Sequence, residues 1–330
     1  MATKWGIVSA GKISADFVTA LSTLPPEDHQ VIAVAARDLE RAKEFAQTHN
    51  IPRAYGSYEE LAKDSDVEIV YIGSINTEHN KLGKLFLNHN KHVLCEKPLC
   101  MNKKEAQELV DLAEEKNLFL LEAIWSRFNP IYRKVVEEIQ SGTIGEVLQV
   151  QVDFGVKLEH KDRVTKKDLG GSVLLDIGVY CIQFATLILG KPDKIQATGH
   201  LNDSGVDDRF AALFSYKDGK VAILSAHSRC CLANEAKVVG TKGTITVNSP
   251  FWCPTSMKAV DQVISIQLPD LNKKFHYNNS SLLKYEAEEV RRCLREKLLE
   301  SSGLTWQESL TIAEIEDEIR KQIGVVFEQD

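Results

Sequence analysis

Trp5-Gly6-Ile7-Val8-Ser9-Ala10-Gly11-Lys12-Ile13-Ser14 is the stretch that decides the fold, because an apolar strand runs there into a tight turn and then into a helical segment. A second apolar strand, residues 31–36, follows after about one β–α–β unit. A helix that begins directly after a strand presents free backbone N–H groups and the positive end of its dipole to an anion. This order predicts a dinucleotide-binding domain whose phosphate turn contains Ser9, Gly11, Lys12 and Ile13.

The turn keeps only part of the glycine pattern of such domains. The pattern G-x-G-x-x-G would have glycine where this chain has Ser9 and Ser14, so only Gly11 remains, the glycine that lets the backbone approach the phosphates. The glycine pattern alone fits a plain α/β turn equally well. The strand before it, the helix after it and the residues that end the second strand favour a cofactor site.

The end of the second strand indicates which dinucleotide is bound. An NAD site usually has Asp or Glu there, whereas this chain has Ala36-Arg37, with Arg41 one helical turn further on. Arginine offers a bidentate fork for a phosphate and a flat face for adenine. We therefore predict NADP rather than NAD. The alternative is that Arg37 and Arg41 only lie at the solvated start of a helix capped by Asp38.

Composition bounds the class of protein. A chain of 330 residues with 43% hydrophobic content can bury a full core, and its length predicts two domains. A net charge of −7 argues against a nucleic-acid or anionic-membrane surface. The first strand begins too early for a signal peptide, and no apolar run approaches membrane-spanning length. The seven cysteines are scattered, without a C-x-x-C pair, so we expect a cytoplasmic protein with reduced thiols and no metal site.

Residues 1–126 alternate short apolar strands with helical stretches, which predicts a Rossmann domain, an α/β fold with a parallel sheet covered on both faces. Further strands are expected at residues 69–72, 92–95 and 119–122. Helices are expected at residues 39–48, 58–63, 78–88 and 103–115, and capping residues mark the starts of several of them.

Residues 127–330 show longer alternating runs, which predict an α+β domain with a large, mostly antiparallel open sheet. The expected strands are 147–156, 194–199, 209–216, 221–228, 236–239, 244–247 and 263–268, with hairpin turns at 217–219 and 241–243. The expected helices are 171–189, 281–300 and 306–323, of which the closing ones can pack back on the first domain.

Several strands of the second domain are apolar on both faces. Phe210, Ala212 and Phe214 lie on one side of a strand, with Ala211 and Leu213 on the other. The helices of the domain can cover one face, and another body must cover the second. We expect a homodimer packed through this sheet, with a better-shielded monomer as the alternative.

The fifth strand of the first domain ends in Cys95-Glu96-Lys97-Pro98. The carboxyl ends of parallel strands form the ligand crevice, so Lys97 is directed at the reactive end of the cofactor, with Glu96 beside it to balance the ammonium. Taken alone, the motif favours a surface lysine in a loop.

A second motif runs from Gly170 to Tyr180, where a glycine pair opens a helix that carries Asp176 and Tyr180 four residues apart. That spacing puts the carboxylate and the phenol on one helix face. Taken alone, Tyr180 is typical of a buried helix aromatic with one hydrogen bond.

Together with His79 in the stretch 74–79 and with residues 122–128, these motifs resemble the glucose-fructose oxidoreductase/inositol dehydrogenase (Gfo/Idh/MocA) family throughout both domains. The family pattern is E-K-P followed by D-x-x-x-H, and this chain has Tyr180 at the histidine position. With the opening stretch and residues 251–255, Tyr180 narrows the resemblance to one branch. That branch implies a cytosolic, NADP-linked homodimer that oxidises trans-dihydrodiols of small aromatics, and aldopyranoses such as D-xylose at the anomeric hydroxyl.

Two alternatives remain open within the resemblance. One is another sugar or polyol dehydrogenase on the same scaffold, because the substrate pocket lies in the least readable part of the sequence. The other is a catalytically silent, NADP-sensing regulator, although the presence of both Lys97 and Tyr180 speaks against it.

Oxidation of a hydroxyl needs a base for its proton, and a phenol with an ordinary pKa near 10 is mostly protonated at neutral pH. A neighbouring ammonium lowers that pKa. We therefore predict Tyr180 as the acid/base group, Lys97 as the cation that activates it and holds the substrate oxygen, and Asp176 as a partner of substrate or of Lys97. The competing assignment makes Lys97 the proton carrier.

Other side chains are expected around these groups. The family position puts His79 at the nicotinamide end of the cofactor site, with Tyr71 and Ser74 near the nucleotide. Three aromatic side chains are expected to form an apolar wall for substrate, because ring faces bury area at low entropic cost and suit both aromatic diols and sugar C–H surfaces: Trp125, Phe154 and Trp252.

Overall fold

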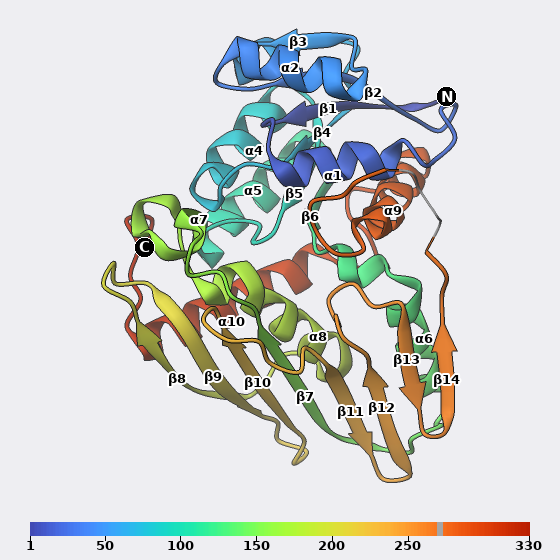
Figure 1. The fold of residues 1–330 in the computed structure, drawn as a ribbon, viewed down its shortest axis with the longest axis vertical. Helices are drawn as coiled ribbons and strands as arrows, with labels where there is room; N and C mark the ends of the chain where they lie inside the picture. The colour runs from blue at the N-terminus through green and yellow to red at the C-terminus, as the bar shows by residue number, and fades with distance from the viewer. Residues whose placement is uncertain (269–272) are drawn as a thin grey trace. The chain divides into compact units, whose positions relative to one another are not determined.

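The computed structural model describes residues 1–268 and 273–330, and the chain divides into two compact units. Unit 1 comprises residues 1–100, 104–128 and 268–306, and unit 2 comprises residues 101–103, 129–267 and 307–330. The sequence prediction divides the chain at residue 126 instead. Figure 1 shows the elements of both units along the chain.

Unit 1 is built on a six-stranded parallel sheet with the strand order β3-β2-β1-β4-β5-β6. The strands are β1 (Thr3–Val8), β2 (His29–Ala35), β3 (Arg53–Tyr55), β4 (Ile69–Ile72), β5 (His92–Glu96) and β6 (Leu120–Ala123). The order reverses between β1 and β4, and ligands of such sheets bind at the carboxyl ends of the strands beside that point. The predicted Rossmann fold is confirmed.

The helices of unit 1 begin where the sequence places caps. The Asp38 carboxylate accepts the Arg41 N–H at 3.0 Å, and the Ser57 hydroxyl accepts the Glu60 N–H at 3.2 Å. The helices are α1 (Lys12–Leu21), α2 (Leu39–His49), α3 (Tyr58–Ala62), α4 (His79–Asn88), α5 (Lys103–Lys116) and α9 (Lys284–Arg295). The stretch with α9 is tied to α1 through Asp16, whose carboxylate accepts the backbone N–H groups of His276 and Tyr277.

Unit 2 contains an eight-stranded sheet with the order β14-β13-β12-β11-β7-β10-β9-β8. Its strands are β7 (Val147–Gly155), β8 (Lys194–Leu201), β9 (Asp207–Ser215), β10 (Val221–His227), β11 (Ala236–Gly240), β12 (Gly243–Val247), β13 (Ser256–Ala259) and β14 (Gln262–Ser265). Only the neighbours β7 and β10 run parallel, and the other described pairs are antiparallel. The prediction of a large, mostly antiparallel sheet is confirmed.

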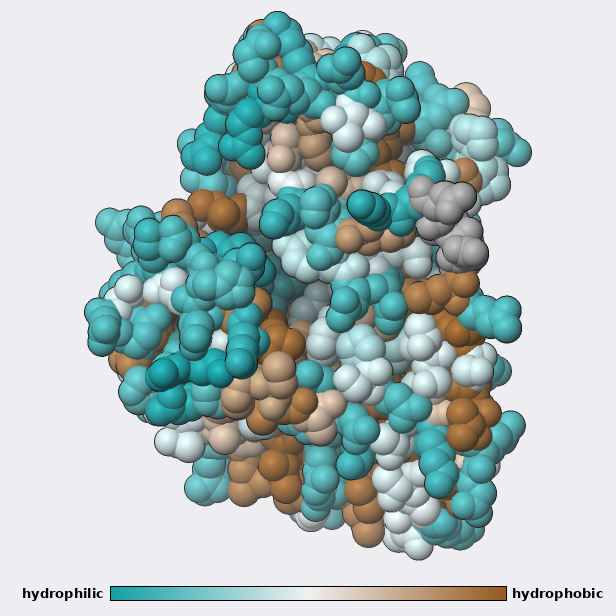
Figure 2. Space-filling model, viewed as in Figure 1, coloured by the Kyte–Doolittle hydropathy of each residue, from teal (hydrophilic) through white to brown (hydrophobic). Residues whose placement is uncertain are grey.

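One face of this sheet is covered by helices of unit 2. α8 (Val179–Leu189) packs on β7 and β10, α6 (Pro130–Gln140) packs on β12 and β13, and Gln322 of α10 (Trp306–Ile323) hydrogen-bonds the backbone of β8. Phe210 and Phe214 are buried on that side. On the other side Leu213 and Ile223 are paired across β9 and β10 and are 38% and 45% exposed. Figure 2 shows hydrophobic residues among hydrophilic ones over the region of this sheet.

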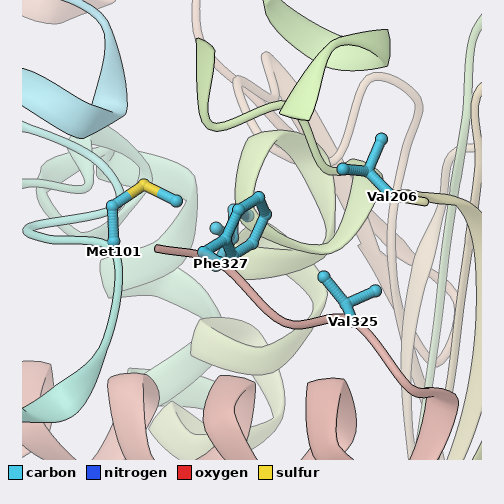
Figure 3. Packing of buried hydrophobic residues seen from close by; sticks show 5 residues of the cluster. Met101, Val206, Val325 and Phe327 are labelled. Carbon is cyan, nitrogen blue, oxygen red and sulfur yellow. The ribbon is translucent and has the colours of Figure 1, made fainter. Parts of the chain in front are cut away.

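A small hydrophobic cluster of unit 2 lies beside the segment that carries Asp176. Its members are Met101, Leu175, Val206, Val325 and Phe327, with Leu201 and Ile323 packed against it. Figure 3 shows the Phe327 ring lying between Met101 and the two valines. Since Leu175 precedes Asp176 directly, this cluster fixes the backbone at Asp176 from one side.

Four of the described strands and α-helices were not predicted from the sequence: β3, β13, α6 and α7 (Asp162–Thr165). The strands are only three and four residues long, too short for a periodic pattern, and α6 begins at Pro130 after the Asn129 cap. The helix expected over 171–189 begins as a π-helical turn, Leu174–Gly178, and continues as α8. The helix expected over 281–300 is a 3₁₀ turn, Ser280–Leu283, followed by α9.

The helical stretch 167–189 is long and apolar enough to cross a membrane by length and composition, although the sequence analysis recognises no run of that length. In the structure, 78% of its most apolar window is buried. It therefore has the character of the core helix of a soluble protein, which is how α8 packs on the sheet.

Candidate active site

The turn between β1 and α1 fits a pyrophosphate. Gly11 caps α1 in an extended conformation, no side chain caps the helix, and its first turn contains no acidic residue. The N–H groups at the start of the helix are therefore not satisfied by a capping side chain, and the helix dipole favours an anion there. Ser9 has a φ of +80°, and its N–H donates to Ala35 O at 2.9 Å, which fixes the turn to the end of β2.

Gly73, just after β4, allows this turn to pack closely, and the sequence analysis missed it. A Cβ at Gly73 would lie 2.4 Å from the Ser14 hydroxyl oxygen and 3.1 Å from the Tyr71 ring. Its N–H donates to Val8 O at 3.0 Å. The close approach of α1 to the end of β4 thus depends on the absence of a side chain at residue 73.

The two arginines at the end of β2 lie at the surface, as a phosphate-binding pair must. Arg37 and Arg41 are exposed, while Asp38 is occupied as the cap of α2. Tyr58 lies close to both guanidiniums and hydrogen-bonds Ser9. Burial raises the pKa of Tyr58 above its ordinary value, and the Arg37 guanidinium opposes that effect. No sequence pattern distinguished Tyr58, which the fold brings to this surface.

Lys97 is held by its neighbours on the loop that follows β5. Its own N–H donates to Glu96 Oε2 at 3.3 Å, and Glu96 Oε1 accepts the Tyr71 phenol at 2.5 Å. The Leu99 N–H donates to Glu122 Oε1 at 2.9 Å. Buried carboxylates from β5 and β6 therefore fix the backbone on both sides of Lys97.

His79 joins two loops at the carboxyl edge of the sheet. The ring is fully buried, with Nδ1 at 2.8 Å from Pro98 O and Nε2 at 3.2 Å from Ser74 O. Burial lowers the pKa of His79, so the neutral ring is favoured. Both ring nitrogens lie near protein carbonyls, and the neutral ring donates its one N–H to one of them, so the geometry gives His79 a role in holding the loops that carry Lys97 and Ser74. Direct contact with a cofactor stays a prediction.

Tyr71 is also fully buried, and its ring stacks on Phe17 with centroids 3.9 Å apart. Like His79, it supports the loop of Lys97 through Glu96. Trp125 lies in the short helix η2 (Trp125–Phe128) of unit 1 and is buried.

In unit 2 a buried carboxylate fixes the segment that carries Asp176 and Tyr180. Asp207 accepts the Ser172 hydroxyl at 2.6 Å and the Leu174 N–H at 2.7 Å. Burial raises the pKa of Asp207, and these hydrogen bonds oppose the shift. The segment then turns as a π-helix before α8. The simple α-helical spacing predicted for Asp176 and Tyr180 is therefore corrected, because Asp176 lies inside the π-turn. Such turns occur frequently at functional sites.

Two of the predicted substrate aromatics lie together with Tyr180. The rings of Phe154 and Trp252 stack with centroids 3.8 Å apart, and Phe154 lies 5.9 Å from the Tyr180 ring. Phe251 packs edge-on against both Phe154 and Trp252. The strand β7, the loop after β12 and the start of α8 thus bring an apolar ring surface next to the phenol.

Asp176 is paired with Arg163, a residue that the sequence analysis did not identify. Arg163 Nη1 donates to Asp176 Oδ1 at 2.5 Å. Asp176 was predicted as a partner of substrate or of Lys97, so the guanidinium is an addition to its expected surroundings. No motif pointed to Arg163, because it lies in a run of mixed charges between β7 and the glycine pair.

Comparison with known proteins extends this description. Residues 3–123 match the model of the oxidoreductase family with an NAD-binding Rossmann fold, and residues 132–246 match the GFO/IDH/MocA C-terminal domain. The trans-1,2-dihydrobenzene-1,2-diol dehydrogenase of Danio rerio is 47% identical over 332 residues, which cover 100% of this chain and 99% of the relative. The Homo sapiens enzyme of that name is 44% identical, with the same coverage.

Among solved structures, the 3-ketoreductase KijD10 of Actinomadura kijaniata, in complex with NADP, is similar with a TM-score of 0.83 and 25% identity over 98% of each chain. A levoglucosan dehydrogenase shares the fold, with a TM-score of 0.85 and 19% identity over 98% of each chain. The two family models together cover more than half of the chain. The chain is an oxidoreductase of the GFO/IDH/MocA family.

Proposed function

We propose that this protein is an NADP-dependent dehydrogenase that oxidises trans-dihydrodiols of aromatic hydrocarbons to catechols. We further propose that it oxidises D-xylose and similar aldopyranoses at the anomeric hydroxyl to the lactone. The observation that carries the proposal is full-length similarity, at 44–47% identity, to enzymes named trans-1,2-dihydrobenzene-1,2-diol dehydrogenase. Both reactions remove a hydride from a carbinol carbon and a proton from its hydroxyl, so one site can serve both.

The chain's own residues supply the proton chemistry in this proposal. Tyr180 takes the hydroxyl proton during oxidation and returns it in the reverse reaction, and Lys97 stabilises the substrate oxygen as its proton leaves. The alternative, in which Lys97 carries the proton, uses the same two residues. Asp176 accepts a hydrogen bond from a substrate hydroxyl. Phe154 and Trp252 provide a ring surface that suits an aromatic diol or the C–H face of a sugar.

The residues of unit 1 fit NADP, which would supply the hydride acceptor when bound. The amides of Gly11, Lys12 and Ile13 would hold the pyrophosphate, since α1 begins without a side-chain cap and without an acid. Arg37 and Arg41 would hold the 2′-phosphate, because both are exposed and the two acids between them are occupied: Asp38 accepts the Arg41 N–H, and Glu40 pairs with Lys43.

We also propose a cytosolic homodimer that associates through the open face of the eight-stranded sheet. Leu213 and Ile223 are exposed and adjacent on that face. A sheet face of this kind is covered in most soluble proteins. A second copy of the chain offers the same surface, so a two-fold arrangement buries both faces at once. No disulfide joins any of the seven cysteines, all of which lie in the part of the chain that the structure describes, and this fits a reducing compartment.

The experiment is a steady-state assay of NADPH formation with a trans-dihydrobenzenediol and, separately, with D-xylose. Wild-type protein is expected to turn over both with NADP. Arg37→Asp is expected to raise KM for NADP by about 10- to 100-fold, because it removes a charge-assisted contact with the 2′-phosphate. KM for NAD is expected to change much less. Absence of turnover with both substrates would contradict the function, and equal effects on the two cofactors would contradict the role of Arg37.

A further inference from the structure

Asp176 and Arg163 form an ion pair between two segments of unit 2. The donor–acceptor distance is 2.5 Å. The Asp176 side chain is 10% exposed, whereas that of Arg163 is 43% exposed. A carboxylate at this depth needs a partner, and a guanidinium supplies a planar donor with a fixed direction. Asp176 is one of the residues to which the reaction is assigned, so Arg163 is the direct partner of such a residue.

The short helix that carries Arg163, α7 (Asp162–Thr165), is packed tightly against the start of the Asp176 segment. The Gly171 N–H donates to Lys166 O at 2.9 Å, and a Cβ at Gly171 would lie 2.6–2.8 Å from backbone atoms of Lys166 and Val164. The Asn202 side chain donates to Thr165 O at 3.1 Å. Glycine at 171 and the amide of Asn202 thus fix the backbone from which Arg163 reaches Asp176.

The backbone at Asp176 is fixed independently. Asp207 holds Ser172 and the Leu174 N–H, and Leu175 is buried in the cluster with Phe327. What these contacts do not determine is the direction of the Asp176 carboxylate itself. The bond from Arg163 to Oδ1 constrains that direction.

We propose that Arg163 is a positioning residue for the oxidation, because its guanidinium holds the Asp176 carboxylate in the orientation in which it accepts a hydrogen bond from a substrate hydroxyl. This inference rests on the proposed function. An ionised carboxylate has about four acceptor sites, so it can bind a guanidinium and a hydroxyl together. A carboxylate that loses the Arg163 bond is held less firmly, and small losses of orientation near reacting atoms reduce turnover strongly.

Lys166, the residue directly after α7, provides a matched control. Lys166 pairs with Asp162 at 2.9 Å, and both side chains are largely exposed. Lys166→Ala removes a cation from the same segment without touching Asp176. Surface pairs of this kind contribute little to stability, so we expect turnover within about twofold of wild type.

The test compares wild type, Arg163→Ala, Arg163→Lys and Lys166→Ala in kcat, in KM for the diol and for D-xylose, and in NADPH affinity by fluorescence. Arg163→Ala is expected to lower kcat by about 30-fold or more, with NADPH affinity within about twofold, because Arg163 lies in unit 2 and the dinucleotide turn in unit 1. Added guanidinium at non-denaturing concentration should restore kcat about fivefold or more in Arg163→Ala, and sodium chloride should not.

Arg163→Lys keeps the positive charge but changes the geometry of the donor groups. It also tests the inference if Arg163→Ala does not fold. It is expected to remain several-fold below wild type in kcat, because an ammonium lacks the planar fork. Three results obtained with an active wild type would overturn the inference. The first is that Arg163→Lys and Arg163→Ala retain the wild-type kcat. The others are that Lys166→Ala loses as much kcat as Arg163→Ala, or that guanidinium does not raise kcat in folded Arg163→Ala. A wild type inert toward both substrates would instead overturn the proposed function, and the role of Arg163 with it.

Discussion

At the scale of single residues, the proposed chemistry depends on one amine and one phenol. Replacing Lys97 with Met is expected to abolish turnover nearly completely, because it removes the cation that stabilises the substrate oxygen. Tyr180→Phe is expected to reduce kcat about 100-fold or more, because it removes the group that takes the hydroxyl proton. NADPH binding, followed by fluorescence, should persist in both variants.

Tyr132 gives a matched control for the phenol. Its hydroxyl accepts a hydrogen bond from Gln183 at 3.1 Å, and it is buried in the same unit as Tyr180. Tyr132→Phe removes a buried hydroxyl without touching the reaction and should retain most of kcat. A kcat in Tyr180→Phe as high as in Tyr132→Phe would remove Tyr180 from the mechanism.

His79 links the site to the pH dependence of stability. Its pKa in the folded chain is lowered, chiefly by burial, so below its ordinary pKa of 6.5 the unfolded chain binds a proton that the folded chain does not. The contribution of His79 is thus complete above about pH 6.5, and it is lost as the pH falls, by at most about 1.4 kcal/mol per pH unit.

His79→Gln is therefore expected to have a lower free energy of unfolding at pH 7.5 and a shallower decline of that free energy between pH 6.5 and 5. Urea unfolding at a series of pH values measures both quantities. The buried His29 and His92, whose pKa values burial also lowers, remain in both proteins and cancel in the comparison. Equal slopes for wild type and variant would contradict the assignment to His79.

At the scale of elements, the junction between α7 and the π-turn depends on Gly171. An added methyl would meet the backbone of Lys166 and Val164 at 2.6–2.8 Å, and backbone cannot move aside cheaply. Gly171→Ala is expected to lower the free energy of unfolding by about 1–3 kcal/mol and to reduce turnover, because the Arg163 segment is displaced.

Gly11→Ala is a suitable comparison for stability. Its methyl would make ordinary contacts at 3.6 Å with Gly73 O and 3.8 Å with the Ser9 hydroxyl. Thermal or urea unfolding of the two variants should show a clear loss for Gly171→Ala and a small change for Gly11→Ala. A Gly171→Ala protein as stable as wild type would show that the junction can relax.

The elements that could be predicted are those with a periodic pattern and a cap. α2 and α3 follow Asp38 and Ser57, whose side chains accept helix N–H groups as expected. The π-turn could not be predicted, because it is imposed by Asp207, a residue about 30 positions later in the chain. Local spacing carries no information about such a partner.

At the scale of the whole molecule, the open sheet face predicts association. Leu213→Asp puts a charge on that face and is expected to convert a dimer into monomers, as measured by light scattering after size exclusion at micromolar concentration. Leu298, in unit 1, is equally exposed at 38%. Leu298→Asp should leave the dimer intact. A wild type with the mass of one chain, or a Leu213→Asp protein that stays dimeric, would contradict association through this face.

The site could be predicted only where the family motifs carry it. Lys97, Asp176 and Tyr180 stand in recognisable patterns. Phe154 and Trp252 were predicted with Trp125 to form an apolar wall, and these two rings stack on each other. Gly73, Tyr58 and Arg163 were missed, because each gains its place from a neighbour distant in sequence, respectively Ser14, Ser9 and Asp176. The residues that support a site leave a weaker sequence signal than those that act in it.

The proposed dehydrogenase activity is tested most directly by following the transferred hydride. A trans-dihydrodiol carrying deuterium at the carbinol carbon is incubated with NADP and the wild-type protein, and the reduced cofactor is analysed by mass spectrometry. The account predicts NADPH that contains one deuterium from the diol, formed at a rate that Lys97→Met nearly abolishes. Reduced cofactor without the label, or labelled cofactor formed equally fast by Lys97→Met, would contradict it.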